Sequence, residues 1–126
     1  MLMKNHERTV VVLGASDSLE RYSNRAIRLL KSEGYRTIPV HPSLKDIEGL
    51  TVIHGLPEIR EKVDTLTVYL GPDKCVHLVD DIIAMKPGRV ILNPGTESET
   101  IEDRLLDAEI PIIHACTLVM LGTGRF

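Results

Sequence analysis

Five short apolar runs divide the chain at regular intervals, and each is apolar almost throughout instead of alternating with polar residues. They cover residues 9–13, 36–40, 65–70, 89–93 and 112–114. A strand with this pattern must be covered on both faces, because neither set of its alternate side chains is suited to contact with water. The runs therefore predict five buried strands of a parallel sheet.

Segments with helical spacing of apolar residues lie between these runs. Residues 23–33 form the first predicted helix; the second begins at Pro72 and ends before Pro87, and Thr96-x-x-Glu99 predicts a capping box for the third. This alternation favours the α/β class, a Rossmann-like doubly wound parallel sheet with helices on both faces. Right-handed crossovers predict the order 3-2-1-4-5 for about five main strands.

Residues 43–63 interrupt the alternation, because a short apolar run at 50–53 and a turn at 56–59 stand where a full crossover helix is usual. We expect a short strand and one helical turn there. At 126 residues with 43% apolar content, the chain has room for one core but not for a second, catalytic domain. No repeat or linker-like stretch divides it, so we expect a single domain over residues 1–126.

The first strand runs directly into Gly14-Ala15-Ser16, a turn that can present backbone N–H groups to an anion. The predicted helix behind it directs its positive N-terminal end to the same place. A dinucleotide-binding turn has the form Gly-x-Gly-x-x-Gly, and this chain has Ser16 and Leu19 at the second and third glycine positions. The pattern indicates a phosphate-binding turn and weakens an ordinary nicotinamide site. A tight turn that binds nothing would also need the glycine.

Ligands of doubly wound sheets bind beyond the carboxyl ends of the strands, so the residues that follow each strand form the expected site. These corners are Gly14-Ala15-Ser16, His41-Pro42, Gly71-Pro72, Asn93-Pro94-Gly95 and Ala115-Cys116. The second corner is informative, because nicotinamide enzymes usually carry Asp or Glu there to hold the adenosine ribose, and this chain has His41. The sequence therefore has no acidic ribose clamp.

The net charge of −3 is nearly balanced, and the 15 Lys and Arg residues form no block of five or more. Nothing in this distribution points to nucleic acid or to a membrane surface as a partner. The N-terminal residues lack the apolar segment of a signal sequence, which predicts a cytoplasmic protein. Two distant cysteines, Cys75 and Cys116, fit a reducing compartment better than a disulfide framework.

An ordered set of stretches extends over nearly the whole chain: the Gly-Ala-Ser turn, Glu20-Arg21-Tyr22-Ser23, Gly34-Tyr35-Arg36-Thr37-Ile38-Pro39-Val40-His41-Pro42, Ile47-Glu48-Gly49-Leu50 and Val63-Asp64-Thr65-Leu66-Thr67-Val68-Tyr69. Together they resemble the small stand-alone CoA-binding proteins. Those proteins are similar in turn to the CoA-binding N-terminal domain of the succinyl-CoA synthetase alpha subunit. The resemblance implies a Rossmann-like domain that holds coenzyme A or an acyl-CoA across the strand ends, in a family for which no catalytic apparatus is established.

The resemblance also implies roles for individual residues. Phosphate contacts come from the turn and the start of the first helix, at Gly14, Ala15, Ser16, Arg21, Ser23 and Asn24. The adenosine end is bordered by His41 and Pro42, with Lys45 as a phosphate-binding candidate on the loop that follows. The wall is formed by Tyr69, Gly71 and Pro72, and the pantetheine arm is approached by Asn93, Pro94 and Gly95.

The chain departs from the family pattern at three places. Relatives usually have Asn-Pro-Lys after the second strand, where this chain has His-Pro-Ser at 41–43 and then a lysine at 45. The fourth corner reads Asn-Pro-Gly-Thr-Glu at 93–97 instead of the common Gln-x-Gly type, and residues 117–126 lack the Glu-His often found there. The thiol end of the site is therefore the part that the resemblance defines least.

Two classes of function remain open. In the first, the protein is a non-catalytic CoA or acyl-CoA module that serves as a carrier, a sensor or the protein partner of an acyl-CoA enzyme. In the second, it is a small enzyme that uses NADP or another nucleotide. The missing glycines and the missing acidic clamp favour the first class.

Ser16 lies in no nucleophile elbow, and His and Cys residues form no metal-binding cluster. Cys75 is expected on the outer part of its helix, and Cys116 is either a buried structural cysteine or a thiol that faces the coenzyme.

Overall fold

Five parallel strands form the centre of the molecule in the computed structural model, which describes residues 4–126. They are β1 (Thr9–Leu13), β2 (Arg36–Val40), β5 (Thr65–Val68), β6 (Arg89–Leu92) and β7 (Ile112–His114). The sheet order is β2-β1-β5-β6-β7, and every neighbouring pair is parallel. All residues of β1 and β5 are buried, as their continuous apolar pattern predicts.

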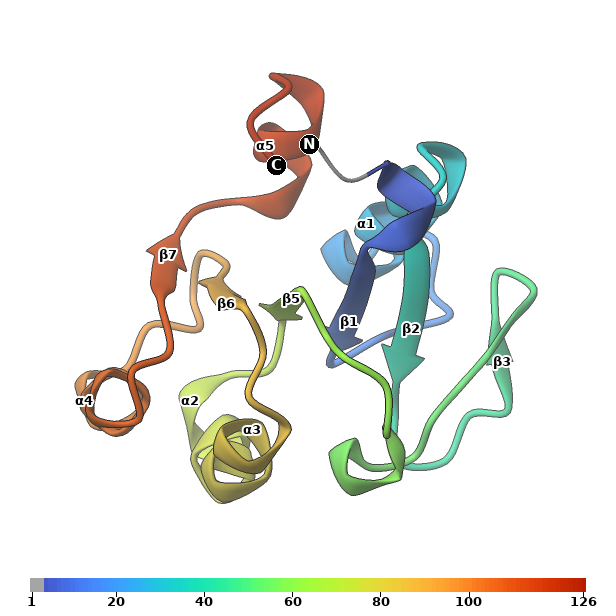
Figure 1. Ribbon diagram of the computed structural model, residues 1–126. Coiled ribbons are helices and arrows are strands. Elements are labelled where there is room, and N and C mark those ends of the chain that lie inside the picture. The colour runs from blue at the N-terminus through green and yellow to red at the C-terminus, as the bar shows by residue number, and fades with distance from the viewer. Residues whose placement is uncertain (1–3) are drawn as a thin grey trace.

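Helices cover both faces of the sheet, as Figure 1 shows. One face carries α1 (Tyr22–Ser32) and α5 (Thr117–Gly122), which pack against each other. The other face carries η2 (Leu56–Glu58), α2 (Pro72–Cys75), η3 (Val76–Leu78), α3 (Val79–Met85) and α4 (Glu99–Asp107). A short 3-10 helix, η1 (Asn5–Glu7), precedes β1.

Alternate side chains of the strands enter two separate cores, because successive residues of a strand point to opposite faces. Val10 belongs to the core that contains Ile27 of α1. Its neighbour Val11 belongs to the core that contains Ile82 of α3 and Ile101 of α4. All five are fully buried, and each such side chain contributes about 1.5–3 kcal/mol when it leaves water.

The doubly wound parallel class is confirmed, and the strand order differs from the expected 3-2-1-4-5 in its numbering. Counted over the five full strands, the order is 2-1-3-4-5, since β5 lies beside β1 and not outside β2. The place outside β2 is taken by a single parallel bridge between Ile53 and Val40. Counting Ile53 as the third strand gives 3-2-1-4-5-6. The apolar runs within residues 43–63 are too short to form a full strand or a crossover helix. This segment forms only the bridge, η2 and a hairpin of two short strands, β3 (Asp46–Ile47) and β4 (Leu50–Thr51).

The third crossover helix, α4, begins later than its expected capping box. Ser98 is its N-cap; its hydroxyl accepts the Ile101 N–H at 3.4 Å, and the Glu102 carboxylate accepts the Ser98 N–H at 3.2 Å. The capping box predicted from Thr96 is wrong, because the Thr96 hydroxyl donates to the Asn93 carbonyl at 2.7 Å. Thr96 thus closes the turn after β6, and the helix starts beyond that turn.

The chain leaves the sheet toward opposite faces after β1 and after β5, which are neighbours. α1 follows β1 on one face, and α2 follows β5 on the other. Segments that diverge in this way leave a crevice beyond the carboxyl ends of the two strands, at the topological switch point. The fold therefore places a crevice, the candidate binding site, between the Gly14 turn and the start of α2.

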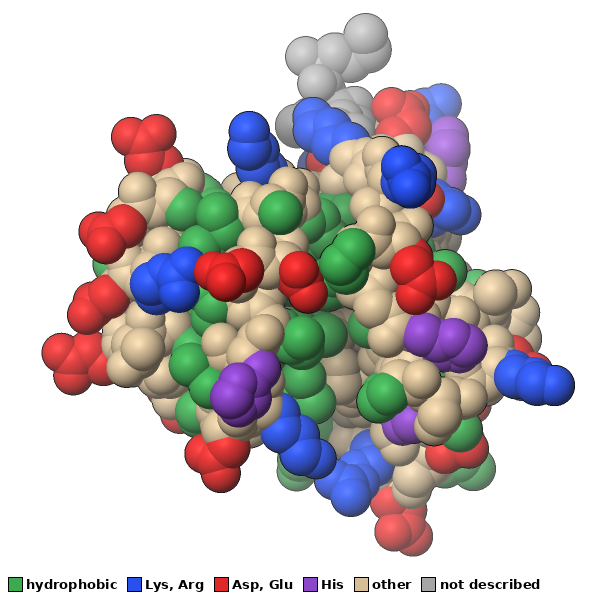
Figure 2. Space-filling view, turned by 90° about the horizontal axis from the view of Figure 1, so that it is seen from below, with side chains coloured by type: hydrophobic (Ala, Val, Ile, Leu, Met, Phe, Trp, Pro, Cys, Tyr) green, Lys and Arg blue, Asp and Glu red, His purple; other side chains and the backbone are tan. Residues whose placement is uncertain are grey.

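Acidic and basic side chains lie next to one another over the surface seen in Figure 2. Two exposed ion pairs, Arg36 with Glu61 and Arg104 with Asp80, join neighbouring segments. Exposed pairs of this kind contribute about 0–1 kcal/mol each, so the two cores hold the layers together. Within residues 4–126, every helix is too short or too polar to cross a membrane.

Candidate functional site

The turn that follows β1 depends on glycine for two separate reasons. Gly14 has φ +88°, a conformation that residues with a side chain rarely adopt. A Cβ atom there would also lie 3.0 Å from the backbone nitrogen of Leu70 and 3.1 Å from the Leu70 side chain. The Ala15 N–H then donates to the Val40 carbonyl at 3.1 Å. The turn is thus held closely between the ends of β2 and β5.

Asn24 holds this turn from behind. Its side chain is fully buried, its amide donates to the Ser16 carbonyl at 2.9 Å, and its Oδ1 accepts from Arg28 Nε at 2.9 Å. The Ser16 hydroxyl accepts the Ser18 N–H at 3.0 Å and keeps its own proton to donate. α1 begins after Arg21 without a side-chain cap from any described residue. The N–H groups of its first turn are therefore available to an anion.

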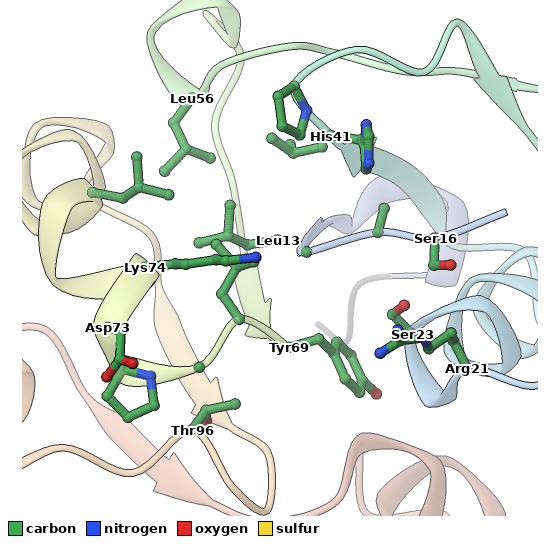
Figure 3. A pocket seen from close by; sticks show the side chains of 18 of the residues that line it. Leu13, Ser16, Arg21, Ser23, His41, Leu56, Tyr69, Asp73, Lys74 and Thr96 are labelled. Atoms are coloured by element: carbon green, nitrogen blue, oxygen red, sulfur yellow. The ribbon is translucent and has the colours of Figure 1, made fainter. Parts of the chain in front are cut away.

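A cleft of about 870 Å³ opens where α1 and α2 diverge. In Figure 3, Ser16, Ser23 and Arg21 lie on one wall, and Lys74 and Asp73 lie on the opposite wall. Ligand cavities usually have volumes of about 300–1,000 Å³, so the cleft is large enough for a coenzyme. Eleven of the expected site residues line it: Gly14, Ala15, Ser16, Arg21, Ser23, His41, Pro42, Tyr69, Gly71, Pro72 and Pro94.

Four expected residues lie outside this lining: Asn24, Lys45, Asn93 and Gly95. The two asparagines are buried behind the cleft, where they hold its walls. Lys45 and Gly95 are exposed beside it. Lys45 stands away from the end of β2 because the chain turns at residues 41–44 before it reaches the lysine.

A buried polar network fastens the start of α5 to the sheet below the cleft. The amide of Asn93 donates to the Thr67 hydroxyl at 2.7 Å, and its Oδ1 accepts the Thr117 N–H at 2.9 Å. The hydroxyls of Thr67 and Thr117 are 2.7 Å apart and share a hydrogen bond. All three side chains are buried, so the network is a fixed support for the ends of β5 and β6.

The Tyr69 hydroxyl is buried beside this network and makes no hydrogen bond within the described part of the chain. Its burial raises the pKa of Tyr69 to about 12. The nearby hydroxyls of Thr117 and Thr67 oppose this rise in pKa, but neither meets it in hydrogen-bonding geometry. Since the hydroxyl is covered and the residue lines the cleft, Tyr69 offers a ligand the surface of its ring.

Two histidines of the cleft have defined hydrogen-bonding roles. His41 Nδ1 accepts the N–H groups of Ser43 and Leu44, both at 3.1 Å. A nitrogen that accepts carries no hydrogen, so the N–H donor of this ring is Nε2. His54 Nε2 lies 3.0 Å from the Leu44 carbonyl, which can only accept, so His54 is the donor. The two rings therefore fix the loop that follows β2.

Lys74 is a candidate that the sequence pattern missed. It lies in the first turn of α2, and in Figure 3 its side chain extends across the cleft toward Leu13. Within residues 4–126, the side chain of Lys74 forms no ion pair. The sequence does contain a signal for this residue. Pro72 marks the start of a helix at a strand end, and a cation in the first turn of that helix lies at the switch point. Arg21 and Lys74 thus contribute positive charge from opposite walls, while Asp73 and Asp81 line the α2–α3 side.

Both cysteines are free thiols, and the environment of Cys75 differs from the one expected. The predicted position of Cys75 on the outer part of its helix is wrong, because the residue ends α2 facing the core and is fully buried. Burial raises the pKa of the Cys75 thiol. Cys116 is partly exposed at the start of α5, outside the cleft lining. No group of three or more His, Cys, Asp or Glu side chains in residues 4–126 is arranged to hold a metal ion.

The parallel doubly wound sheet, with a glycine turn and a cleft at its switch point, defines a Rossmann-like α/β domain. Within that class, the family described as CoA binding domain matches residues 8–122. The chain belongs to this family.

Comparison with known proteins finds similar chains of different lengths. A crystal structure of an uncharacterized protein shares 40% sequence identity and a TM-score of 0.89, covering 94% of this chain and 98% of that one. The uncharacterized protein YneT of Bacillus subtilis (strain 168) is 29% identical over 74 residues, which are 59% of this chain and only about half, 55%, of that protein. Dinucleotide-forming acetyl-coenzyme A synthetase 1 of Ca. Korarchaeum cryptofilum, solved with phosphate and ADP, shares the fold at 20% identity and a TM-score of 0.73. That match covers 90% of this chain and 28% of the synthetase.

Proposed function

We propose that this protein binds coenzyme A or an acyl-CoA at the carboxyl ends of its parallel strands, as a non-catalytic carrier, sensor or partner module. One observation carries the proposal: the Gly14 turn, the uncapped start of α1, Arg21 and Lys74 all meet at one cleft. Coenzyme A carries a pyrophosphate and a 3'-phosphate. Backbone donors and cations on two walls suit such a ligand without any residue having to react.

The remaining surface of the cleft suits the other parts of this ligand. The ring of Tyr69 and the side chains of Leu70, Leu78 and Pro94 supply apolar surface between the charged walls. An adenine ring and an extended pantetheine arm would both gain from contact with such surface. Membership in the CoA binding domain family supports coenzyme A as the ligand over other phosphorylated compounds.

The polar side chains of the cleft have structural roles that support binding over reaction. His41 Nδ1, the ring nitrogen whose lone pair would have to take a proton when Nε2 carries the hydrogen, already accepts two backbone N–H groups. The Ser16 hydroxyl accepts the Ser18 N–H within the turn. Tyr69, with its pKa raised to about 12, stays protonated at neutral pH. These groups shape and hold the cleft, which is the role that a binding module requires.

Mass spectrometry under non-denaturing conditions tests the ligand class. The purified protein is incubated with equal amounts of coenzyme A, NADP and NAD, and the retained mass is measured. We expect the mass of one coenzyme A. We also expect Arg21→Gln with Lys74→Gln to reduce its retention, and Lys62→Gln, just before β5 at the opposite edge of the sheet, to leave it unchanged. Retention of a nicotinamide nucleotide in place of coenzyme A would contradict the proposal and favour a small nucleotide-dependent enzyme.

A further inference from the structure

His41 occupies the position where Rossmann-like sites recognise the ribose of their nucleotide. It follows the last residue of β2 directly and lines the cleft. In dinucleotide sites with a free ribose, an Asp or Glu near this strand end accepts hydrogen bonds from the ribose hydroxyls. A carboxylate there would repel a phosphate on the same ribose. The chemistry of the side chain at this position therefore decides between a free and a phosphorylated ribose.

The loop after β2 turns His41 into a hydrogen-bond donor. Its Nδ1 is occupied by the N–H groups of Ser43 and Leu44 at 3.1 Å, which leaves the proton on Nε2. Among the described residues, no hydrogen-bond partner is found for Nε2. The ring is half-buried, so its orientation is held by the loop while one edge stays accessible from the cleft.

The acidic residues of the cleft are remote from this corner in the fold. Asp73 and Asp81 belong to the α2–α3 wall, whereas His41 lies at the end of β2, on the far side of β1 from β5. The chain brings one cation, Lys45, to the loop beyond the histidine, exposed and outside the cleft lining. A phosphate at this corner would meet a fixed donor, with a lysine on the adjoining loop.

We propose that His41 is a specificity-determining residue that selects a ligand whose adenosine ribose carries a phosphate. This inference rests on the proposed function and deepens it. For coenzyme A, the Nε2–H of His41 donates to the 3'-phosphate, and the backbone of residues 43–44 keeps the ring in the tautomer that can do so. A hydrogen bond to a charged acceptor is stronger than one to a neutral hydroxyl, so removal of the phosphate weakens binding.

Two substitutions separate the two nitrogens of this ring. Asparagine places its Oδ1 where His41 has Nδ1, so His41→Asn keeps the acceptor for the loop and removes the distant donor. Glutamine reaches the position of Nε2, so His41→Gln keeps a donor for the ligand and removes the acceptor for the loop. The pair therefore distinguishes ligand recognition from support of the loop, and thermal unfolding of each variant reports on the loop.

Calorimetric titration with coenzyme A and with dephospho-CoA gives the readout. Wild type should prefer coenzyme A by about tenfold or more. His41→Asn should lose most of that preference, because its affinity for coenzyme A falls more than its affinity for dephospho-CoA, and His41→Gln should keep the preference. Unchanged preference in a folded His41→Asn variant would overturn the inference, as would equal affinity of wild type for the two ligands. Failure of wild type to bind either ligand would instead overturn the proposed function.

Discussion

Alanine at Gly14 should destabilise the protein more than alanine at Gly95, although the two glycines have nearly the same backbone conformation. Their φ angles are +88° and +92°, so the cost of placing a side chain in this region, about 1–2 kcal/mol, is common to both. Only at Gly14 does the added Cβ meet a neighbour, the Leu70 backbone nitrogen at 3.0 Å. Within the described residues, nothing lies within 4 Å of a Cβ at Gly95.

The expected difference follows from the rigidity of that neighbour. Leu70 N belongs to the backbone two residues after the end of β5, so it cannot move aside as the end of a flexible side chain would. Forcing an extra carbon into a packed place typically costs about 1–3 kcal/mol. We therefore expect a loss of about 1–2 kcal/mol in the free energy of unfolding for Gly95→Ala and about 2–5 kcal/mol for Gly14→Ala.

Urea unfolding followed by circular dichroism measures both losses. Domains of this size have unfolding free energies of about 5–15 kcal/mol, so both variants should still fold and give complete transitions. The slopes of the transitions should match that of wild type, because the folded and unfolded surfaces hardly change. If the two variants lose the same stability, the close approach of the Gly14 turn to Leu70 is not a constraint, and the argument for this turn is refuted.

Other expected outcomes concern the cleft and its surroundings. Lys74→Gln should weaken coenzyme A binding about tenfold in calorimetry, because a cation that faces the phosphates is lost. The control Lys62→Gln should leave the affinity unchanged, and equal effects of the two substitutions would contradict the role of Lys74. Iodoacetamide should modify Cys116 in the native protein and Cys75 only after unfolding, because burial covers the Cys75 thiol and raises its pKa. The mass of the intact protein shows how many cysteines have reacted, and modification of Cys75 in the native protein would contradict this expectation. Stability should fall as the pH rises from 10 to 12, because the folded protein keeps the Tyr69 proton, with a pKa of about 12, while the unfolded chain loses it near the ordinary value of 10. Tyr69→Phe should remove that part of the loss in urea unfolding, and an unchanged pH dependence would count against the buried hydroxyl.

The layers of the fold could be predicted from the sequence because apolar strands and amphipathic helices are local patterns. The strand order could not be read as directly, since it depends on which segment reaches the place beside β2. Ile53 takes that place with one bridge, and a single bridging residue leaves no periodic signal. The start of α4 was misplaced for a similar reason. Thr96 and Ser98 are both good caps by type, and only the turn that begins at Asn93 decides between them.

The position of the site could be predicted because the strand ends of a parallel sheet converge at one edge. Which way each side chain points is set by contacts that the sequence does not display. Asn24 reads as a polar residue at a helix start, yet its hydrogen bonds to Ser16 and Arg28 bury it behind the turn. Lys74 reads as an ordinary surface lysine, yet the direction of α2 carries it over the cleft. The donor state of His41 follows from the loop geometry alone.

The central claim is that the cleft at the switch point binds coenzyme A through its phosphates. Calorimetric titration of wild type with coenzyme A and, separately, with pantetheine tests this claim most directly, because pantetheine keeps the thiol and the arm but has no phosphate. We predict saturable binding of coenzyme A with one site per chain, and binding of pantetheine at least about a hundredfold weaker, since several charge-assisted contacts are lost. Equal affinity for the two ligands, or the absence of any binding of coenzyme A, would contradict the account.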